Sequence, residues 1–278
     1  MNRDYWREMF SYTALYRKMA KVKKLVKPQK VSFGKHRDQY FLHYAPLTAK
    51  SDKVVVWIHG GGWNAGNPKD FDFVGQHFAK EGYHCISLGY RLSPKHKYPC
   101  QTEDVCAGFV KAKKYLADCG VDTSKIIVTG PSAGAHLAAA LCYDRVFQEK
   151  YAIDTDCIIG YIGVAGPLSF RKGMTWTVRT LLGQLFAKGY DRSLGEPCSF
   201  LQKNIIPMLL IHSRHDGLLD YSMSEDFYEK ANALGMECEL YDVVDKLDTH
   251  SAYSAGMFLE TRATNKALDK LFTWIEQA

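Results

Sequence analysis

Six short apolar runs, separated by longer segments with helical spacing, constrain the fold of this chain more than any other feature. The runs, which we predict to be strands, cover Val54–Ile58, His84–Leu88, Ile126–Thr129, Ile158–Val164, Met208–His212 and Glu239–Val244. The predicted helices lie near residues 70–82, 101–118, 134–148, 222–234 and 264–277. Compact, β-branched strands of this kind are typical of parallel sheets with both faces covered. The sequence therefore predicts an α/β fold with a mostly parallel central sheet and helices on both faces.

Two segments lie outside this alternation, and both are candidates for a cap over the sheet edge. Residues 1–34 form a basic N-terminal segment, whose apolar side chains recur at helical spacing over 5–26 until Pro28 ends the helix. Residues 167–207 carry no strand signal but keep helical intervals between Trp176 and Phe186. Since 278 residues can bury one large core, we predict a main domain over 35–278, with a first strand near Tyr40–Tyr44 and a short cap excursion near 167–207.

The formal net charge of +6 is concentrated in the first thirty residues. Nine of the 36 basic and two of the 30 acidic side chains lie there, so this segment carries +7 and the rest of the chain −1. A nearly neutral main domain gives no reason to expect a nucleic-acid partner. We interpret the segment as a packing helix with a solvated basic face, outside the main domain, and do not expect membrane contact. Attachment to an anionic membrane is the alternative.

The eight cysteines form no C-x-x-C pair, and no Cys/His spacing matches a zinc site. Most of them lie in apolar segments, which indicates buried free thiols in a reducing compartment. Charged residues interrupt the N-terminus where a secretory signal would need an apolar stretch. No apolar run is long enough to span a bilayer, so we predict a cytoplasmic protein without a metal.

A serine lies in a glycine-containing turn directly after the strand Ile126–Thr129. The turn is Gly130-Pro131-Ser132-Ala133-Gly134, a G-x-S-x-G pattern between a strand and an alanine-rich helix. Such a turn presents a serine hydroxyl above the sheet in a strained conformation and needs small neighbours. An ordinary glycine-rich turn is the alternative, so a second motif has to decide.

The second motif, His59-Gly60-Gly61-Gly62-Trp63, follows the strand Val54–Ile58. A His-Gly-Gly-Gly run is expected by chance only ~0.005 times in a chain of this composition. Successive glycines allow backbone N–H groups to converge, so two of them and the amide after the serine could hold an oxyanion. A phosphate-binding loop is the alternative, but no Lys-Ser/Thr pair follows the glycines.

A serine nucleophile needs a base, and the base needs a carboxylate that fixes its tautomer. Asp216 follows the strand Met208–His212, and His250 lies in the loop beyond Glu239–Val244, so both lie at the carboxyl edge of the sheet. The order serine, aspartate, histidine is that of the α/β-hydrolases. The competing acids and histidines are Asp220, Asp245, Asp248, His212 and His215; the two histidines adjoin Asp216 too closely to receive its carboxylate.

These residues, with Tyr90-Arg91-Leu92-Ser93-Pro94, resemble the esterase branch of the α/β-hydrolases that is similar to hormone-sensitive lipase. The resemblance covers approximately residues 35–278. It implies an α/β-hydrolase fold in which Ser132 is the nucleophile, His250 the base and Asp216 the orienting acid. It also implies that the amides of Gly61, Gly62 and Ala133 form the oxyanion hole, while Gly60 shapes the loop.

Two departures concern the substrate. Pro131 stands where that branch usually has an acid, and the string from Ser132 to Leu137 also resembles the arylformamidase group. Trp63 is a candidate substrate-pocket residue, with a place in the core as the equal alternative. We interpret His136, on the helix after the serine, as structural.

The sequence therefore predicts a serine hydrolase that cleaves short-chain carboxylic esters through an acyl-enzyme. Its partner would be a small-molecule ester, and it would need no cofactor. An arylformamidase-type amidase and a non-catalytic binding protein on a hydrolase scaffold are the alternatives. The sequence carries no signal for an oligomeric state.

Overall fold

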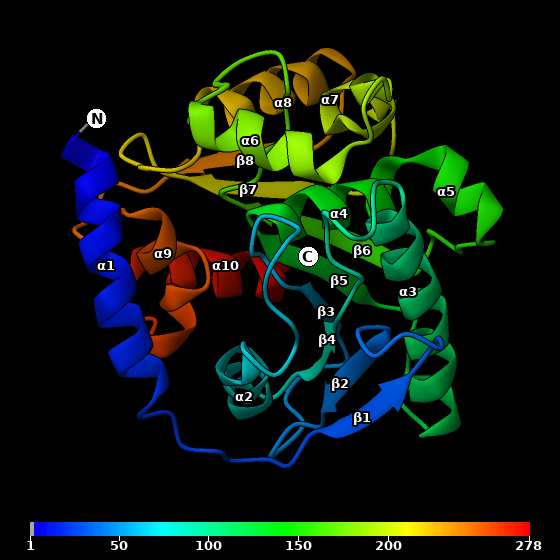
Figure 1. Cartoon of the computed structure of the whole chain (residues 1–278). Coiled ribbons are helices and arrows are strands. Elements are labelled where there is room, and N and C mark those ends of the chain that lie inside the picture. Colours follow the sequence, from blue (N-terminus) through cyan, green and yellow to red (C-terminus); the bar gives the residue numbers. More distant parts are fainter. Residues whose placement is uncertain (1–2) are drawn as a thin grey trace.

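The computed structural model describes residues 3–278 and contains one eight-stranded sheet, in the order β1-β2-β4-β3-β5-β6-β7-β8 (Figure 1). The strands are β1 (Gln29–Ser32), β2 (Tyr40–Tyr44), β3 (Val54–Ile58), β4 (His84–Leu88), β5 (Ile126–Pro131), β6 (Ile158–Val164), β7 (Met208–His212) and β8 (Cys238–Asp242). β1, β2 and β4 pair antiparallel, and every pairing from β4 to β8 is parallel. The prediction of a mostly parallel sheet is confirmed.

Alternate residues of the central strands enter two different cores, one on each face of the sheet. Val54, Val56 and Ile58 pack in the larger core, whereas Val55 and Trp57 pack in the other. The larger core is covered by α3 (Cys100–Asp118), α4 (Ala133–Tyr143), α6 (Trp176–Leu185) and α8 (Ser222–Ala233), and the other core by α2 (Asp72–Glu81) and α10 (Lys266–Gln277). Burial on both faces explains why these strands are apolar at every position.

The predicted helix over 134–148 consists of two helices, α4 and α5 (Arg145–Lys150). Asp144 separates them, because its side chain accepts a hydrogen bond from the Val146 amide and its backbone is extended. This is the geometry of a helix N-cap, where a carboxylate replaces a missing backbone partner. The remaining short helices are α7 (Pro197–Phe200), α9 (His250–Tyr253) and the 3₁₀ helices η1 (Arg192–Gly195) and η2 (Gly256–Leu259).

The N-terminal helix α1 (Arg3–Met19) ends seven residues before the predicted end of the helix over 5–26, and Pro28 does not end it. The buried Gln76 side chain accepts hydrogen bonds from the amides of Leu25 and Val26 and donates one to the Val26 carbonyl. These bonds satisfy backbone groups that a helix would have used, so the chain runs extended toward β1. The first two residues of the predicted segment 1–34 lie outside the described part of the chain.

Helix α1 lies beside α9 and the C-terminal part of the chain (Figure 1). It packs through Met19 against the core that α2 and α10 cover. Among residues 3–278, no helix combines the length and the apolar character needed to cross a bilayer. All eight cysteines are free thiols, as predicted.

Candidate active site

Ser132 lies between β5 and α4 with a backbone φ of 54° and ψ of −123°. A positive φ is rare for a residue with a side chain and is typical of strained functional turns. The turn also needs Gly134, because a Cβ there would lie 2.0 Å from the carbonyl oxygen of Ile58. The glycine thus lets α4 start against the end of β3, and the serine is presented at the carboxyl edge of the sheet.

The glycine loop after β3 also has left-handed backbone, with φ of 106° at Gly61 and 57° at Gly62. A Cβ at Gly61 would lie 2.2 Å from the Ala65 carbonyl oxygen, so only glycine fits there. Within residues 3–278, neither glycine amide donates a hydrogen bond to the protein. Ala133 is the first residue of α4, where backbone N–H groups have no intrahelical partner. The three amides are therefore available to a developing negative charge.

The side chain of His59 packs beneath the sheet-edge glycine loop that follows it and bonds to the backbone of that loop. Its buried ring stacks on Tyr90, with the ring centroids 4.2 Å apart, and its Nδ1 bonds to the Gly60 carbonyl oxygen at 2.7 Å. The Tyr90 hydroxyl donates to the His59 carbonyl at 3.0 Å. Burial lowers the pKa of His59 to about 4, although its bond to Gly60 opposes the shift. The ring is therefore neutral at neutral pH and acts as a structural support.

Asp216 and His250 form a hydrogen bond of 2.8 Å between Oδ2 and Nδ1. The Asp216 side chain is fully buried, and its other oxygen accepts from the amides of Leu218 and Leu219, both at 2.8 Å. The Tyr253 hydroxyl donates to the same oxygen as the histidine. Because the carboxylate holds Nδ1, Nε2 is the ring nitrogen left for proton transfer.

The two groups shift each other's pKa values. Burial would raise the pKa of Asp216, but the attraction of His250, their hydrogen bond and further partners outweigh it and lower the pKa to about 2. Burial would lower the pKa of His250, but Asp216, through charge and hydrogen bonding, raises it above 6.5, and Glu8 adds to this effect. The carboxylate thus stabilises the protonated imidazole, which a general base requires.

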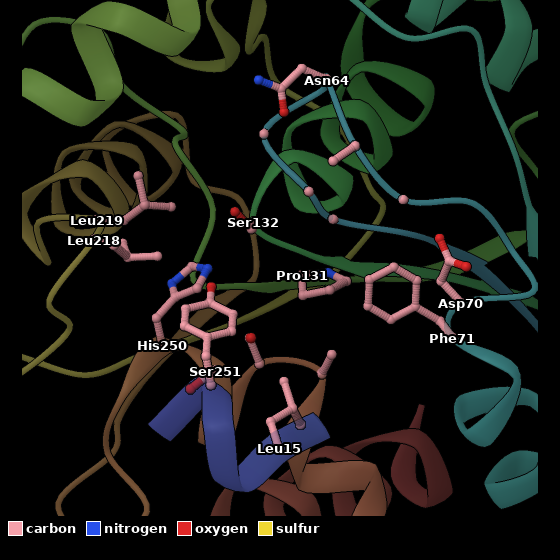
Figure 2. Close-up of a pocket in the computed structure, with 18 of the residues that line it drawn as sticks. Leu15, Asn64, Asp70, Phe71, Pro131, Ser132, Leu218, Leu219, His250 and Ser251 are labelled. Carbon is pink, nitrogen blue, oxygen red and sulfur yellow. The ribbon is translucent and has the colours of Figure 1, made fainter. Parts of the chain in front are cut away.

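Ser132 and His250 line one cavity of about 650 Å³, together with the glycine loop (Figure 2). In Figure 2 the ring of His250 points toward Ser132. Apolar side chains form most of the remaining wall: Leu15 and Met19 of α1, Phe71, Leu181 of α6, and Leu218 and Leu219 after β7. Asn64 and Asp70 add polar groups. A volume of this size suits a small, mainly apolar molecule.

Trp63 does not line this cavity. It is 2% exposed and packs in the core, where its Nε1 donates to Nδ1 of His136 at 3.3 Å. The structure thus contradicts its assignment to the substrate pocket, because the ring is held against α4. His136 is fully buried, and its Nε2 bonds to the Gly195 carbonyl oxygen at 2.7 Å. Burial lowers its pKa to about 4, so the prediction of a structural histidine agrees with its place.

The competing residues have partners of their own. His212 does reach the carboxylate, against expectation, since its Nε2 lies 3.6 Å from Oδ2 of Asp216, but His250 is closer at 2.8 Å. His212 is fully buried and bonds to the Ser224 hydroxyl and the Leu219 carbonyl. Asp248 forms an ion pair with Arg7. The other three bond or pair as follows: Asp220 with the Ser222 amide, Asp245 with the amides of Leu247 and Lys266, and His215 with Asp4.

Sequence reasoning missed three residues near the site. Glu8 of α1 is fully buried and accepts hydrogen bonds from the amides of His250 and Ser251. Tyr12 of α1 lines the cavity, and Tyr253 binds Asp216. Glu8 lies three residues after Tyr5 and four before Tyr12, so it shares the apolar stripe of the predicted helix. An acid in such a stripe was the available signal.

The chain is similar in sequence to one family model and to proteins named as esterases. The BD-FAE family model matches residues 42–231 of the chain. The esterase LipQ of Mycobacterium tuberculosis is 34% identical over 229 residues, which cover 77% of this chain and 53% of LipQ. The carboxylic ester hydrolase LipN of the same organism is 33% identical over 111 residues, which cover 39% of this chain and 30% of LipN. The matched part of the chain thus spans 30% of LipN and 53% of LipQ, about half of the longer-matched relative at most.

Among solved structures, the Francisella virulence factor BioJ superimposes with a TM-score of 0.78. The match covers 98% of this chain and 91% of BioJ at 21% sequence identity. At this identity the likeness concerns the fold, which is that of the α/β-hydrolase esterases, as predicted.

Proposed function

This chain belongs to the BD-FAE family, and from that membership we propose that it is a serine hydrolase that cleaves short-chain carboxylic esters. The observation that carries the proposal is the buried hydrogen bond between Asp216 and His250, at the edge of the cavity that Ser132 also lines. The ester-hydrolase names of LipQ and LipN support the same reaction class. A metal or organic cofactor has no step to perform in this mechanism.

In the proposed acylation, the Ser132 hydroxyl attacks the ester carbonyl and Nε2 of His250 takes its proton. The carbonyl oxygen becomes negative and accepts hydrogen bonds from the amides of Gly61, Gly62 and Ala133. When the tetrahedral intermediate breaks down, the alcohol leaves with the proton from His250, and the acyl group stays on the serine. A water molecule then repeats the sequence, which releases the acid and restores Ser132.

The cavity supports a small ester as substrate. Its volume of about 650 Å³ and its apolar wall suit a short acyl group with a compact aryl or alkyl alcohol. Helix α6 contributes Leu181 and Thr177 to the wall, and α1 contributes Tyr12, Leu15, Tyr16 and Met19. We propose that these two helices together form the short cap.

The test of the nucleophile is Ser132→Ala. The wild-type protein should turn over p-nitrophenyl acetate and become labelled by a fluorophosphonate probe, because an activated serine attacks the phosphorus atom of the probe, displaces fluoride and becomes phosphonylated. Ser132→Ala should lose both signals. The matched control is Ser193→Ala, an exposed serine, which should keep both. Retained labelling of Ser132→Ala would refute the assignment, and no reaction of the wild type would favour a binding protein.

The substrate class is tested by a chain-length series of p-nitrophenyl esters, with N-formylkynurenine as the amide competitor. If the substrates are short-chain esters, kcat/KM should be highest for acyl groups of two to about six carbons and should fall for longer chains. Faster turnover of N-formylkynurenine than of every ester would identify an amidase instead.

A further inference from the structure

Three polar side chains of α1 contact the segment that contains His250. Arg7 pairs with Asp248 at 2.6 Å, and Ser11 bonds to the hydroxyls of Thr249 and Ser251, both at 2.8 Å. The third side chain, Glu8, lies between these two on the same helix. In Figure 2, α1 passes directly beneath His250 and Ser251. Helix α1 therefore contacts the segment 248–251 on both sides of His250.

The contact that Glu8 makes is the most buried of the three. Its side chain has no exposed surface, Oε2 accepts from the His250 amide at 2.6 Å, and Oε1 accepts from the Ser251 amide at 2.8 Å. Each carboxylate oxygen thus holds one of the first two N–H groups of α9. Charge-assisted bonds of this kind are short and about twice as strong as neutral ones.

Burying a carboxylate is costly unless strong partners compensate for the lost water. An apolar residue at this place in the stripe of α1 would pack without that cost. The presence of a carboxylate at position 8 is therefore explained by its two hydrogen-bond donors, the backbone amides of His250 and Ser251. The imidazole is fixed at its other end by Asp216, so the backbone and the ring each have one carboxylate partner.

We propose that Glu8 is a positioning residue for His250, and that α1 is thereby a required part of the active site rather than a packing helix outside it. The inference rests on the proposed function, in which His250 is the base. By holding the two amides, Glu8 fixes where the Cα atom of His250 lies, and so fixes the reach of Nε2 toward Ser132. A displacement of about 1 Å at such a group can lower a rate by about 100-fold.

The charge of Glu8 also acts on the imidazole, because its attraction for the protonated ring contributes to the raised pKa of His250. The other ionisable groups around the ring are Asp216 and His212 near the end of β7, Tyr253 of α9, and Tyr12 of α1. Burial lowers the pKa of His212, so it stays neutral, and burial raises the pKa of both tyrosines, so they stay protonated. The two carboxylates are thus the charges that stabilise the imidazolium.

The test uses two substitutions of Glu8 in the full-length protein. Glu8→Gln keeps the length of the side chain but removes its charge, and Glu8→Asp keeps the charge but is too short to reach both amides. For Glu8→Gln we expect kcat to fall about 10- to 100-fold with little change in KM, since Glu8 does not line the cavity. The acid limb of kcat/KM should also move to lower pH, by about half a unit. Glu8→Asp should lower kcat, while the midpoint of the acid limb of kcat/KM should stay near its wild-type pH.

Two controls separate positioning from general stability. Ser11→Ala removes an uncharged contact of the same helix with the same segment, so it should leave the pH profile in place. Glu260→Gln removes the charged partner of Lys18 on α1, and Glu260 does not line the cavity, so this variant should leave kcat unchanged. Circular dichroism and thermal unfolding report whether each variant is folded.

A folded Glu8→Gln with kcat within threefold of the wild type and an unmoved acid limb would overturn the proposal. If Glu8→Gln does not fold, Glu8→Asp decides: a lowered kcat supports positioning, and a wild-type kcat refutes it. If the wild-type protein hydrolyses no ester, the proposed function fails by itself. The His250 pKa, measured by NMR of its imidazole resonances, then decides: a lower value in Glu8→Gln than in the wild type supports the inference, and an equal value refutes it.

Discussion

The carboxylate of Asp216 has more partners than the orientation of one histidine requires. Two backbone amides hold one of its oxygens, and His250 and Tyr253 share the other. The two amides fix the carboxylate in place. The Tyr253 hydroxyl occupies a second lone pair of Oδ2, so the imidazole of His250 cannot bond to that lone pair in another orientation. Tyr253 lies three residues after His250 in α9, so one turn of helix supplies both donors.

Asp216→Asn should lower kcat by about 10⁴ and leave the protein folded. The amide oxygen of asparagine can still accept from Leu218 and Leu219, but its NH₂ group faces Nδ1 of His250 and favours the wrong tautomer. The measurement is kcat for p-nitrophenyl acetate with a circular dichroism spectrum of each variant. Asp220→Asn is the control, because this exposed side chain caps only the Ser222 amide. A loss of less than tenfold in Asp216→Asn would exclude an orienting role.

The raised pKa of His250 predicts the pH dependence of the reaction. The base must be neutral to take the serine proton, so kcat/KM should be full at high pH and fall as the pH drops through this pKa. Because the pKa lies above its ordinary value of 6.5, the midpoint of the acid limb should also lie above 6.5. The buried His59 and His136, with pKa values of about 4, stay neutral in this range. A midpoint at or below 6.5 would contradict the arrangement.

At the scale of an element, helix α6 contains a glycine that its structure does not require. Gly183 is exposed and has nothing within 4 Å of an added Cβ, and its φ is not left-handed. Gly183→Ala should therefore stabilise the protein by about 1 kcal/mol, because alanine loses less backbone entropy in a helix. Gly235→Ala is the matched opposite: the space is also open, but φ is +69°, so this variant should be destabilised by about 1–2 kcal/mol. Thermal unfolding of both variants should shift Tm in opposite directions.

Elements with an apolar pattern were predictable from the sequence, and those without one were not. The strands β3, β4, β6 and β7 have the predicted bounds, because each is a compact apolar run buried on both faces. Strand β1 was missed, since three of its four residues are exposed and its sequence, QKVS, alternates too little to give a signal. The break between α4 and α5 was missed because it depends on the capping of one side chain, Asp144.

The site was predictable to the extent that its residues follow strands. Ser132, Asp216 and His250 each come after a strand, and parallel strands end at one edge. The prediction placed His250 in a loop, whereas it is the first residue of α9. Glu8 and Tyr12 could not be placed by this reasoning, because no strand carries α1 to the site and its position depends on tertiary contacts alone.

For the whole molecule, part of the basic excess of the N-terminal segment has a structural use. Arg7 pairs with Asp248, and Lys18 pairs with Glu260, so two of its cations join α1 to the C-terminal part of the chain. The Arg7 pair is partly shielded, and its hydrogen bond and charge attraction raise the pKa of the guanidinium. The local charge of +7 thus includes groups whose partners lie more than 200 residues away.

The bonds between Glu8 and the start of α9 join residues 242 and 243 positions apart in the chain. Closing so large a loop costs more chain entropy than pairing neighbouring strands, so it should follow the assembly of the sheet. On refolding from denaturant, far-UV circular dichroism should recover first and hydrolysis of p-nitrophenyl acetate later. Equal rate constants for the two signals would show that the ends of the chain meet early. If activity recovers after the sheet has formed, a newly synthesised molecule has its sheet and its nucleophile, Ser132, in place before His250 is positioned as the base.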